Sequence, residues 1–341
     1  MNWLKNSRQS IVLETIKLSR PNKCISFVPT QLPDQTLYSW VTMFHRLSGN
    51  ASNDLTRVQL FGSEKAGRHF HIPSHLATFC ARTHLVLGAP EQLIAKTTVI
   101  PFFTRFRPTT VIRDTLAMLK GENAAGVPQM LSMGKIGPCQ PLACRYCLEC
   151  AHEEMLELNF SYWHRAHQLP GALVCHKHAT PLIISPLQIG HRFLTRFIEP
   201  ELGLISISPE RCSNEIKATR ATLLRLAILA KDIADCAFAD GYDQPRLRRT
   251  FKKALNMKFS VGRTGGHDPL KLSSAYSDHF HDVQTVPEIQ VIFNQRGVHA
   301  LWCLLESIEC RAHPLEWMLI IDWLFGSWDA FRICFLGTEY N

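Results

Sequence analysis

The sequence has no apolar run long enough to cross a bilayer, which takes about 20 residues. The best candidate, LEWMLIIDWLFGSW at residues 315–328, is too short and is interrupted by Asp322. Lysine, arginine and glutamate interrupt the first 25 residues, so the apolar centre of a secretory signal is missing there. We therefore expect a soluble intracellular protein without a membrane partner, and we interpret residues 1–25 as a leader.

The motifs of several enzyme classes are also missing. No G-x-x-x-x-G-K-[ST] sequence occurs, which argues against a Walker-type ATPase. His152 stands beside Glu153 and Glu154, but no second histidine completes the H-E-x-x-H pattern of a metalloprotease. The C-x-x-C pairs lack the βαβ surroundings of a redox motif. These absences disfavour a zinc-dependent nuclease or hydrolase, and we expect a protein that is not an enzyme.

Charged residues make up only 19% of the sequence, but they are unevenly distributed. Residues 245–271 contain eight basic residues and one acidic residue, Asp268, and so carry +7 of the net +8. A local excess of this size indicates a polyanionic partner, and double-stranded DNA is the one we expect. The alternative is an ordinary solvated helix face. The candidate DNA-binding residues are Arg246, Arg248, Arg249, Lys252, Lys253, Lys258, Arg263 and Lys271.

Hydrophobic periodicity predicts a mainly α-helical protein. In LPDQTLYSWVTMFHRLSGN, apolar residues recur at helical spacing, with Asp34 as the expected cap and Gly49 as the expected end. We predict a helical, helix-turn-helix-like domain at 26–128, a zinc ribbon at 139–185, and a C-terminal helical domain at 200–341. Within the last, a basic helix, a glycine-containing turn and a helix opened by Asp268 and Pro269 form a second helix-turn-helix-like segment at 242–281.

Twelve cysteines need an explanation in a compartment that keeps thiols reduced. Two pairs have the spacing of zinc ligands, Cys144-x-x-Cys147 and Cys175-x-x-His178, with 27 residues between them. The overlapping pair Cys147-x-x-Cys150 has the same spacing. We predict one structural zinc ion, and the alternative is a reduced cysteine core without metal. Other candidate ligands close by in the sequence are Cys139, His152 and His176.

The stretch FSYWHRAHQLPGALVC lies between the two pairs. Its residues Tyr162, Trp163, His164 and His167 would suit a surface on which nucleic-acid bases stack. The other interpretation, which we favour, is that Trp163 and Leu169 pack against the metal-binding turns.

The order of these pieces resembles the TniQ/TnsD family of target-selecting transposition proteins. LPDQTLYSWVTMFHRLSGN is similar to the family's P-D-E-S-L-x-S-W opening, with Gln35 and Thr36 in place of E-S. CRYCLECAHEEMLELNFSYWHRAHQLPGALVCHKHATPL is similar to its C-P-x-C…Y-W-x-R-x-H-Q-L-P-G-V-x-x-C-x-x-H pattern, with Arg145 in place of proline. AHPLEWMLIIDWLFGSWDAF is similar to a segment near the end of TnsD-like members.

The resemblance implies a fold and a ligand set. It implies an N-terminal helix-turn-helix region and a zinc-ribbon core, and it favours Cys144 over Cys150 as a partner of Cys147. A second Cys/His cluster, which many family members carry, has no counterpart in SPLQIGHRFLTRFIEPELG, so we predict one zinc ion. The implied zinc ligands are Cys144, Cys147, Cys175 and His178.

The resemblance also implies a function, which is to choose where a transposon inserts. Such a protein binds target DNA and recruits an AAA+ ATPase regulator and, through it, the transposase complex. It would work in the bacterial cytoplasm, at the nucleoid, and a homodimer is expected by resemblance alone. The alternative is an adaptor that docks on a guide-RNA effector complex, as in CRISPR-associated transposons, and reads little DNA itself.

Overall fold

The computed structural model describes residues 25–67, 69–133, 143–188, 200, 210–236, 242–259, 267–295, 297–306 and 312–338. These residues are mainly helical and contain one two-stranded sheet, so the predicted fold class is confirmed. Residues 1–24 of the expected leader lie outside the described residues, as does the predicted DNA contact Arg263.

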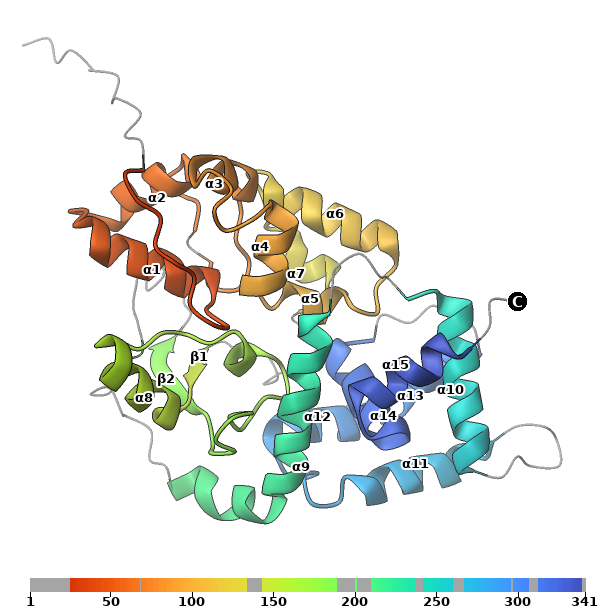
Figure 1. Cartoon of the computed structure of the whole chain (residues 1–341). Helices are drawn as coiled ribbons and strands as arrows, with labels where there is room; N and C mark the ends of the chain where they lie inside the picture. The colour runs from red at the N-terminus through yellow and green to blue at the C-terminus, as the bar shows by residue number, and fades with distance from the viewer. Residues whose placement is uncertain are drawn as a thin grey trace, which may run out of the picture.

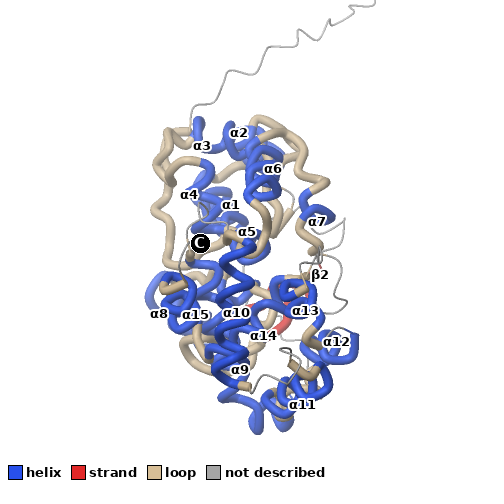
Figure 2. Tube along the Cα trace, turned by 90° about the vertical axis from the view of Figure 1, so that its right-hand side faces the viewer, coloured by secondary structure: helices blue, strands red, loops and turns tan. Residues whose placement is uncertain are grey.

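The N-terminal region is built from short helices, which Figure 2 shows gathered at one end of the molecule. Its described helices are α1 (Leu37–Ser48), α2 (Asn53–Phe61), α3 (Leu76–Arg82), α4 (Pro90–Thr97), α5 (Ile100–Thr104), α6 (Thr109–Lys120) and α7 (Val127–Met130).

The start of α1 differs from the prediction. Thr36 is the cap, and its hydroxyl accepts a hydrogen bond from the backbone N–H of Ser39 at 3.2 Å. The prediction that Asp34 caps this helix was therefore wrong. Asp34 instead adopts a left-handed conformation, with φ of 54°, in the turn before the helix. Gly49 ends the helix as predicted, with φ of 61°.

A small central module follows in the chain. Strand β1 (Ala143–Tyr146) leads directly into helix α8 (Leu148–Leu158), the 3₁₀ turn η2 (Ala166–Gln168) comes next, and β2 (Ile183–Gln188) closes the module. The two strands pair antiparallel, with Arg145 opposite Ile184 and Tyr146 opposite Ile183. Together with the turn at 176–178, this is the place where the sequence predicted a ribbon.

The C-terminal region contains the longest described helix, α9 (Glu210–Asp235), which runs between the central module and the remaining helices (Figure 1). The helix predicted to open at Asp268 is present. Asp268 is its N-cap, since its carboxylate accepts the N–H of Leu270 at 3.0 Å. The remaining helices are α10 (Gln244–Lys258), α11 (Pro269–His279), α12 (Pro287–Gln295), α13 (His299–Leu305), α14 (Pro314–Phe325) and α15 (Trp328–Leu336).

One hydrophobic core joins all three regions. Phe106, from the N-terminal region, has its ring centroid 5.5 Å from Trp317 of α14 and 5.7 Å from Tyr242. Buried residues of the central module, including Leu169 and Cys175, belong to the same cluster. The predicted domain boundaries stay predictions, but they do not divide the buried core of the described residues.

The apolar run at 315–328 is accounted for within this core. Helix α14 is buried on all sides from Pro314 to Trp323, and Gly326 ends it in a left-handed conformation before α15 begins. Among the described residues, no helix combines the length and the apolar character that a membrane crossing requires.

Candidate metal centre

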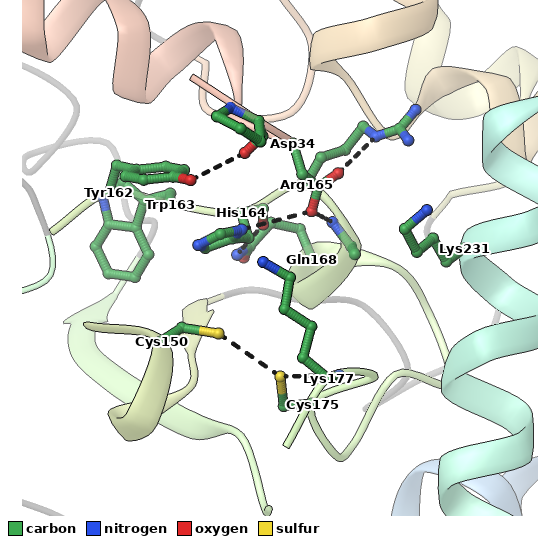
Figure 3. Close-up of polar contacts among 12 residues, drawn as sticks. Asp34, Cys150, Tyr162, Trp163, His164, Arg165, Gln168, Cys175, Lys177 and Lys231 are labelled. Atoms are coloured by element: carbon green, nitrogen blue, oxygen red, sulfur yellow. Dashed lines mark hydrogen bonds and ion pairs between the residues drawn. The ribbon is translucent and has the colours of Figure 1, made fainter. Parts of the chain in front are cut away.

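Three cysteines and one histidine lie close together at the N-terminal end of α8. Cys147 is the N-cap residue of this helix, and Cys150 lies in its first turn. Cys175 and His178 lie on the facing turn. One ligand atom from each of the four residues lies within 4.8 Å of the others, the three cysteines are buried, and His178 is half-buried. Figure 3 shows Cys150 and Cys175 pointing toward each other from opposite sides.

The spacing of the four atoms suits a tetrahedral ion. With bonds of about 2.3 Å to sulfur and about 2.0 Å to nitrogen, zinc would have sulfur–sulfur edges of about 3.8 Å and sulfur–nitrogen edges of about 3.5 Å. The sulfurs of Cys150 and Cys175 are 3.7 Å apart. Nδ1 of His178 is 3.4 Å from the sulfur of Cys147, 3.4 Å from that of Cys150 and 3.7 Å from that of Cys175. The donor set and its geometry therefore fit a zinc-type ion.

Cys144 does not belong to this group, which corrects the ligand set drawn from the family resemblance. Cys144 lies on β1, and Cys147 directly follows this strand. Three residue steps of extended chain span about 10 Å and turn the two side chains to opposite faces. Cys147 and Cys150, by contrast, lie three apart at a helix start and share one face. Cys144 instead packs with Tyr146 and Trp163 in a small buried cluster, where burial raises the pKa of its thiol.

The surroundings favour thiolate at Cys175. Hydrogen bonds from Cys147 and Cys150, and then from the backbone N–H groups of His178 and Lys177, lower the pKa of Cys175 well below its usual range despite its burial. The Lys177 N–H lies 3.4 Å from the sulfur. The thiolate is the form of cysteine that binds metals, so this sulfur is prepared for an ion.

The imidazole of His178 is oriented by a carboxylate that the sequence analysis did not connect with it. Its Nε2 lies 3.1 Å from Oε1 of Glu153 on α8, while Nδ1 faces the sulfurs. A carboxylate on the outer nitrogen of a ligating histidine fixes the ring and strengthens the ligand. Burial lowers the pKa of His178, but hydrogen bonds to Cys147 and Cys175 outweigh burial and raise it to about 9.

A buried polar network lies next to the metal centre and joins it to the N-terminal region. The Asp34 carboxylate accepts the backbone N–H of Ala166 at 2.9 Å and the Nε–H of Arg165 at 3.4 Å. Arg165 also donates to the carbonyl of Ala95 at 2.7 Å and pairs with Asp235 on α9. One arginine therefore links three regions of the chain.

His164 and His167 lie on the same segment in contrasting environments. His164 is hydrogen-bonded to Glu154, and its Nδ1 is 3.7 Å from Asp34. Burial opposes its charge, but these two carboxylates outweigh burial and raise the pKa of His164 to about 9. Burial, and then the charge of His164, lower the pKa of His167 to about 3. His164 is therefore a cation and His167 a neutral ring at neutral pH.

The aromatic residues between the two ligand pairs are core residues. Trp163 is 1% exposed and packs against Tyr146 and Phe70, and Leu169 is fully buried. Both residues are packed in the core, Leu169 in the cluster that contains Cys147, Cys150 and Cys175 and Trp163 in the separate cluster of Cys144. This stretch is buried and does not form a surface on which bases could stack.

Arg145, which stands where the family has proline, also has a structural role. Its guanidinium donates to the carbonyls of Ala172 at 2.8 Å and Leu169 at 3.2 Å. Its backbone N–H donates to the side-chain oxygen of Gln168 at 3.0 Å, a bond that proline could not make. The departure from the family pattern thus brings hydrogen bonds of its own.

The predicted DNA-binding residues divide into two groups. Arg246 is buried, and its guanidinium donates to the carbonyls of Phe335 at 2.9 Å and Leu336 at 2.8 Å. Arg248 donates to the carbonyl of Leu304 at 2.9 Å, Arg249 is half-buried, and the Lys258 amine donates to the carbonyl of Trp323. The side chains that are exposed and have no such contact among the described residues are Lys252, Lys253 and Lys271.

Comparison with known proteins agrees with the sequence resemblance. Residues 26–182 match the TniQ family model, a range that includes the four candidate metal ligands as well as Asp34 and Arg165. The chain is 21% identical over 165 residues to the transposon Tn7 transposition protein TnsD of Escherichia coli. That alignment covers 48% of this chain and 32% of TnsD, so the chain matches about a third of this relative. The basic helices α10 and α11 lie beyond the family match.

Proposed function

We propose that this chain, whose residues 26–182 match the TniQ family model, is a non-enzymatic selector of transposition target sites. The proposed protein binds target DNA and recruits an AAA+ ATPase and the transposase complex. The observation that carries the proposal is the family match, together with the similarity to a transposition protein.

The metal centre has a structural role in this proposal. Cys147, Cys150, Cys175 and His178 hold one zinc ion, which ties the turn at 175–178 to the start of α8. Four protein ligands complete the coordination, and a closed site of this kind leaves no position for a substrate. The proposal is supported by the tetrahedral spacing of the ligands and by the carboxylate of Glu153 on His178.

The proposed DNA contacts are Lys252 and Lys253 on α10 and Lys271 on α11. All three are exposed, and they flank a chain segment that contains Arg263. Lysines of this kind contact phosphates and give affinity with a strong dependence on salt, but little sequence information. Sequence reading would require further side chains to reach base edges.

Binding to duplex DNA across a salt series tests this proposal. The salt slope is the steepness with which the logarithm of the binding constant falls with the logarithm of the salt concentration. The double variant K252E/K253E should bind more weakly and have a salt slope smaller by about 2, because each lost phosphate contact reduces the slope by about 0.9. The matched control K65E/K96E changes the same charge at two exposed lysines of the N-terminal region and should leave the slope unchanged. Equal effects of the two double variants would contradict a DNA surface on α10.

A second function, an adaptor on a guide-RNA effector complex, is favoured by one observation. Arg246, Arg248 and Lys258 donate to backbone carbonyls within the fold, so the exposed basic surface is smaller than the sequence suggested. Weak, sequence-blind DNA binding combined with stable binding to a guide-RNA complex would support the adaptor over the direct reader.

A further inference from the structure

A second group of metal-type ligands includes Cys175 together with two histidines. One ring nitrogen of His167, one of His176 and the sulfur of Cys175 lie within 4.8 Å of one another. His176 is the residue after Cys175 on the metal-binding turn, and His167 belongs to η2. The two groups share Cys175, and each also takes a histidine from the turn at 176–178, His178 in the first group and His176 in the second. The remaining ligands come from the start of α8 in the first group and from η2 in the second.

His167 is the unusual member of this group. Its side chain is 1% exposed, and neither ring nitrogen has a hydrogen-bond partner among the described residues. Buried polar atoms are nearly always hydrogen-bonded, and leaving one without a partner lowers the stability of the fold. The ring lies between two other imidazoles, with its centroid 4.8 Å from that of His164 and 6.2 Å from that of His176. A metal ion on the Cys175 side would satisfy one of these nitrogens.

We propose that a second, zinc-type ion binds His167, Cys175 and His176, and that the Cys175 thiolate bridges this ion and the structural zinc. The inference rests on the structural zinc proposed above. Imidazole and thiolate are the ligands that zinc prefers, and three protein ligands leave the fourth position open to water. The second ion would fasten the metal-binding turn to η2, the segment next to Arg165.

The second ion binds more weakly than the first. It has three ligands in place of four, and its thiolate already neutralises part of the charge of the structural zinc. The side chains of Lys177 and Lys231 also act electrostatically on His176, so they oppose a further cation there. We therefore expect one ion per chain at low free zinc and a second ion only as free zinc rises.

Equilibrium dialysis of the full chain against buffered free zinc tests the inference, with bound metal counted by mass spectrometry. The wild-type chain should bind its two zinc ions in two separate steps as the concentration of free zinc rises. His167→Gln and His176→Gln should each weaken the second step at least about tenfold and leave the first unchanged, and Cys175→Ser should weaken both. The control His152→Gln changes an exposed histidine of α8 outside both groups and should leave both steps intact.

His176→Gln keeps the test valid if the buried His167 variant fails to fold, because His176 is only half-buried. A single ion per chain at all zinc concentrations would overturn the inference, as would a second ion that neither histidine variant weakens. No bound ion at all would instead refute the structural zinc. With cadmium in place of zinc, NMR coupling between two bound ions would identify the bridging sulfur independently.

Discussion

The Asp34 carboxylate accepts the backbone N–H of Ala166, although 132 residues separate the two in the chain. Asp34 belongs to the LPDQ segment and Ala166 to YWHRAHQLPG, the two stretches that carried most of the family resemblance. A third such stretch joins them, because Gly171 packs against Met318 and Leu315 of the HPLEWML segment. The family motifs therefore specify contacts between distant parts of one core.

The first prediction concerns the charge of Asp34. Asp34→Asn should lower the free energy of unfolding by about 2 kcal/mol at neutral pH, because it removes the charged partner of Arg165 and His164. Asparagine tolerates the left-handed backbone at this position, so the variant isolates the charge. Urea unfolding followed by circular dichroism measures the loss, with Asp114→Asn, an exposed aspartate of α6, as the control.

The effect of Asp34 should depend on pH. Burial raises the pKa of this carboxyl, but hydrogen bonds and the charges of His164 and Arg165 outweigh burial and lower it to about 2, from 3.8. A carboxyl whose folded pKa is depressed contributes stability above its unfolded pKa and loses it as pH falls through the folded pKa. The stability gap between wild type and Asp34→Asn should therefore close between about pH 4 and about pH 2. A gap that stays constant over this range would show that the charge is not its source.

Gly171 should tolerate no side chain. Its φ is +81°, and a Cβ would lie 2.6 Å from Cε of Met318 and 2.8 Å from Cδ1 of Leu315. Gly171→Ala should cost about 3 kcal/mol of stability, from backbone strain and overpacking together. Gly49→Ala is the matched control, because its φ is +61° but no atom lies within 4 Å of the added Cβ. It should cost about 1 kcal/mol in thermal or urea unfolding, and equal losses at both positions would argue against the close packing.

Two cysteine variants test whether Cys150 or Cys144 is the zinc ligand. At low free zinc, Cys150→Ser should reduce zinc affinity by more than about 100-fold, since loss of even an outer contact to a ligand costs up to that amount. Cys144→Ser should keep the zinc, because Cys144 lies in a separate cluster. Metal content after dialysis measures both. Zinc loss in Cys144→Ser with retention in Cys150→Ser would restore the ligand set of the family pattern.

Arg246 should act in folding and not in DNA binding. Arg246→Gln should destabilise the chain by about 2–3 kcal/mol, because two charged hydrogen bonds to the end of α15 are lost. It should leave the salt slope for DNA unchanged. Lys252→Gln on the same helix should reduce the salt slope for DNA and keep the stability within about 0.5 kcal/mol of wild type. An altered salt slope in Arg246→Gln alone would place DNA on the buried side of α10.

The sequence predicted features that depend on local periodicity and on turn residues. The helical class, the end of α1 at Gly49 and the cap at Asp268 all follow from neighbouring residues. The choice between Cys144 and Cys150 does not, because both have ligand spacing from Cys147. What separates them is that a strand precedes Cys147 and a helix follows it, and only the second arrangement turns two sulfurs to one side.

Contacts between residues far apart in the chain could not be predicted from the sequence either. Nothing local distinguishes Arg246, whose side chain reaches the end of α15, from Lys252, which is exposed six residues later. A count of basic residues gives the net charge, but it does not show which basic side chains form hydrogen bonds within the fold and which are exposed. The same applies to Asp34, which has the local pattern of a helix cap but binds a segment far along the chain.

The central claim is that this protein selects a DNA site, and selection from a library of random duplexes tests it most directly. Zinc-loaded wild type should enrich a shared sequence and bind it at physiological salt at least about 1,000-fold more tightly than the starting pool, the low end for specific DNA readers. Enrichment of no sequence, with equal affinity for every duplex, would contradict the claim. Another component of the transposition machinery would then choose the site, and this chain would be the adaptor.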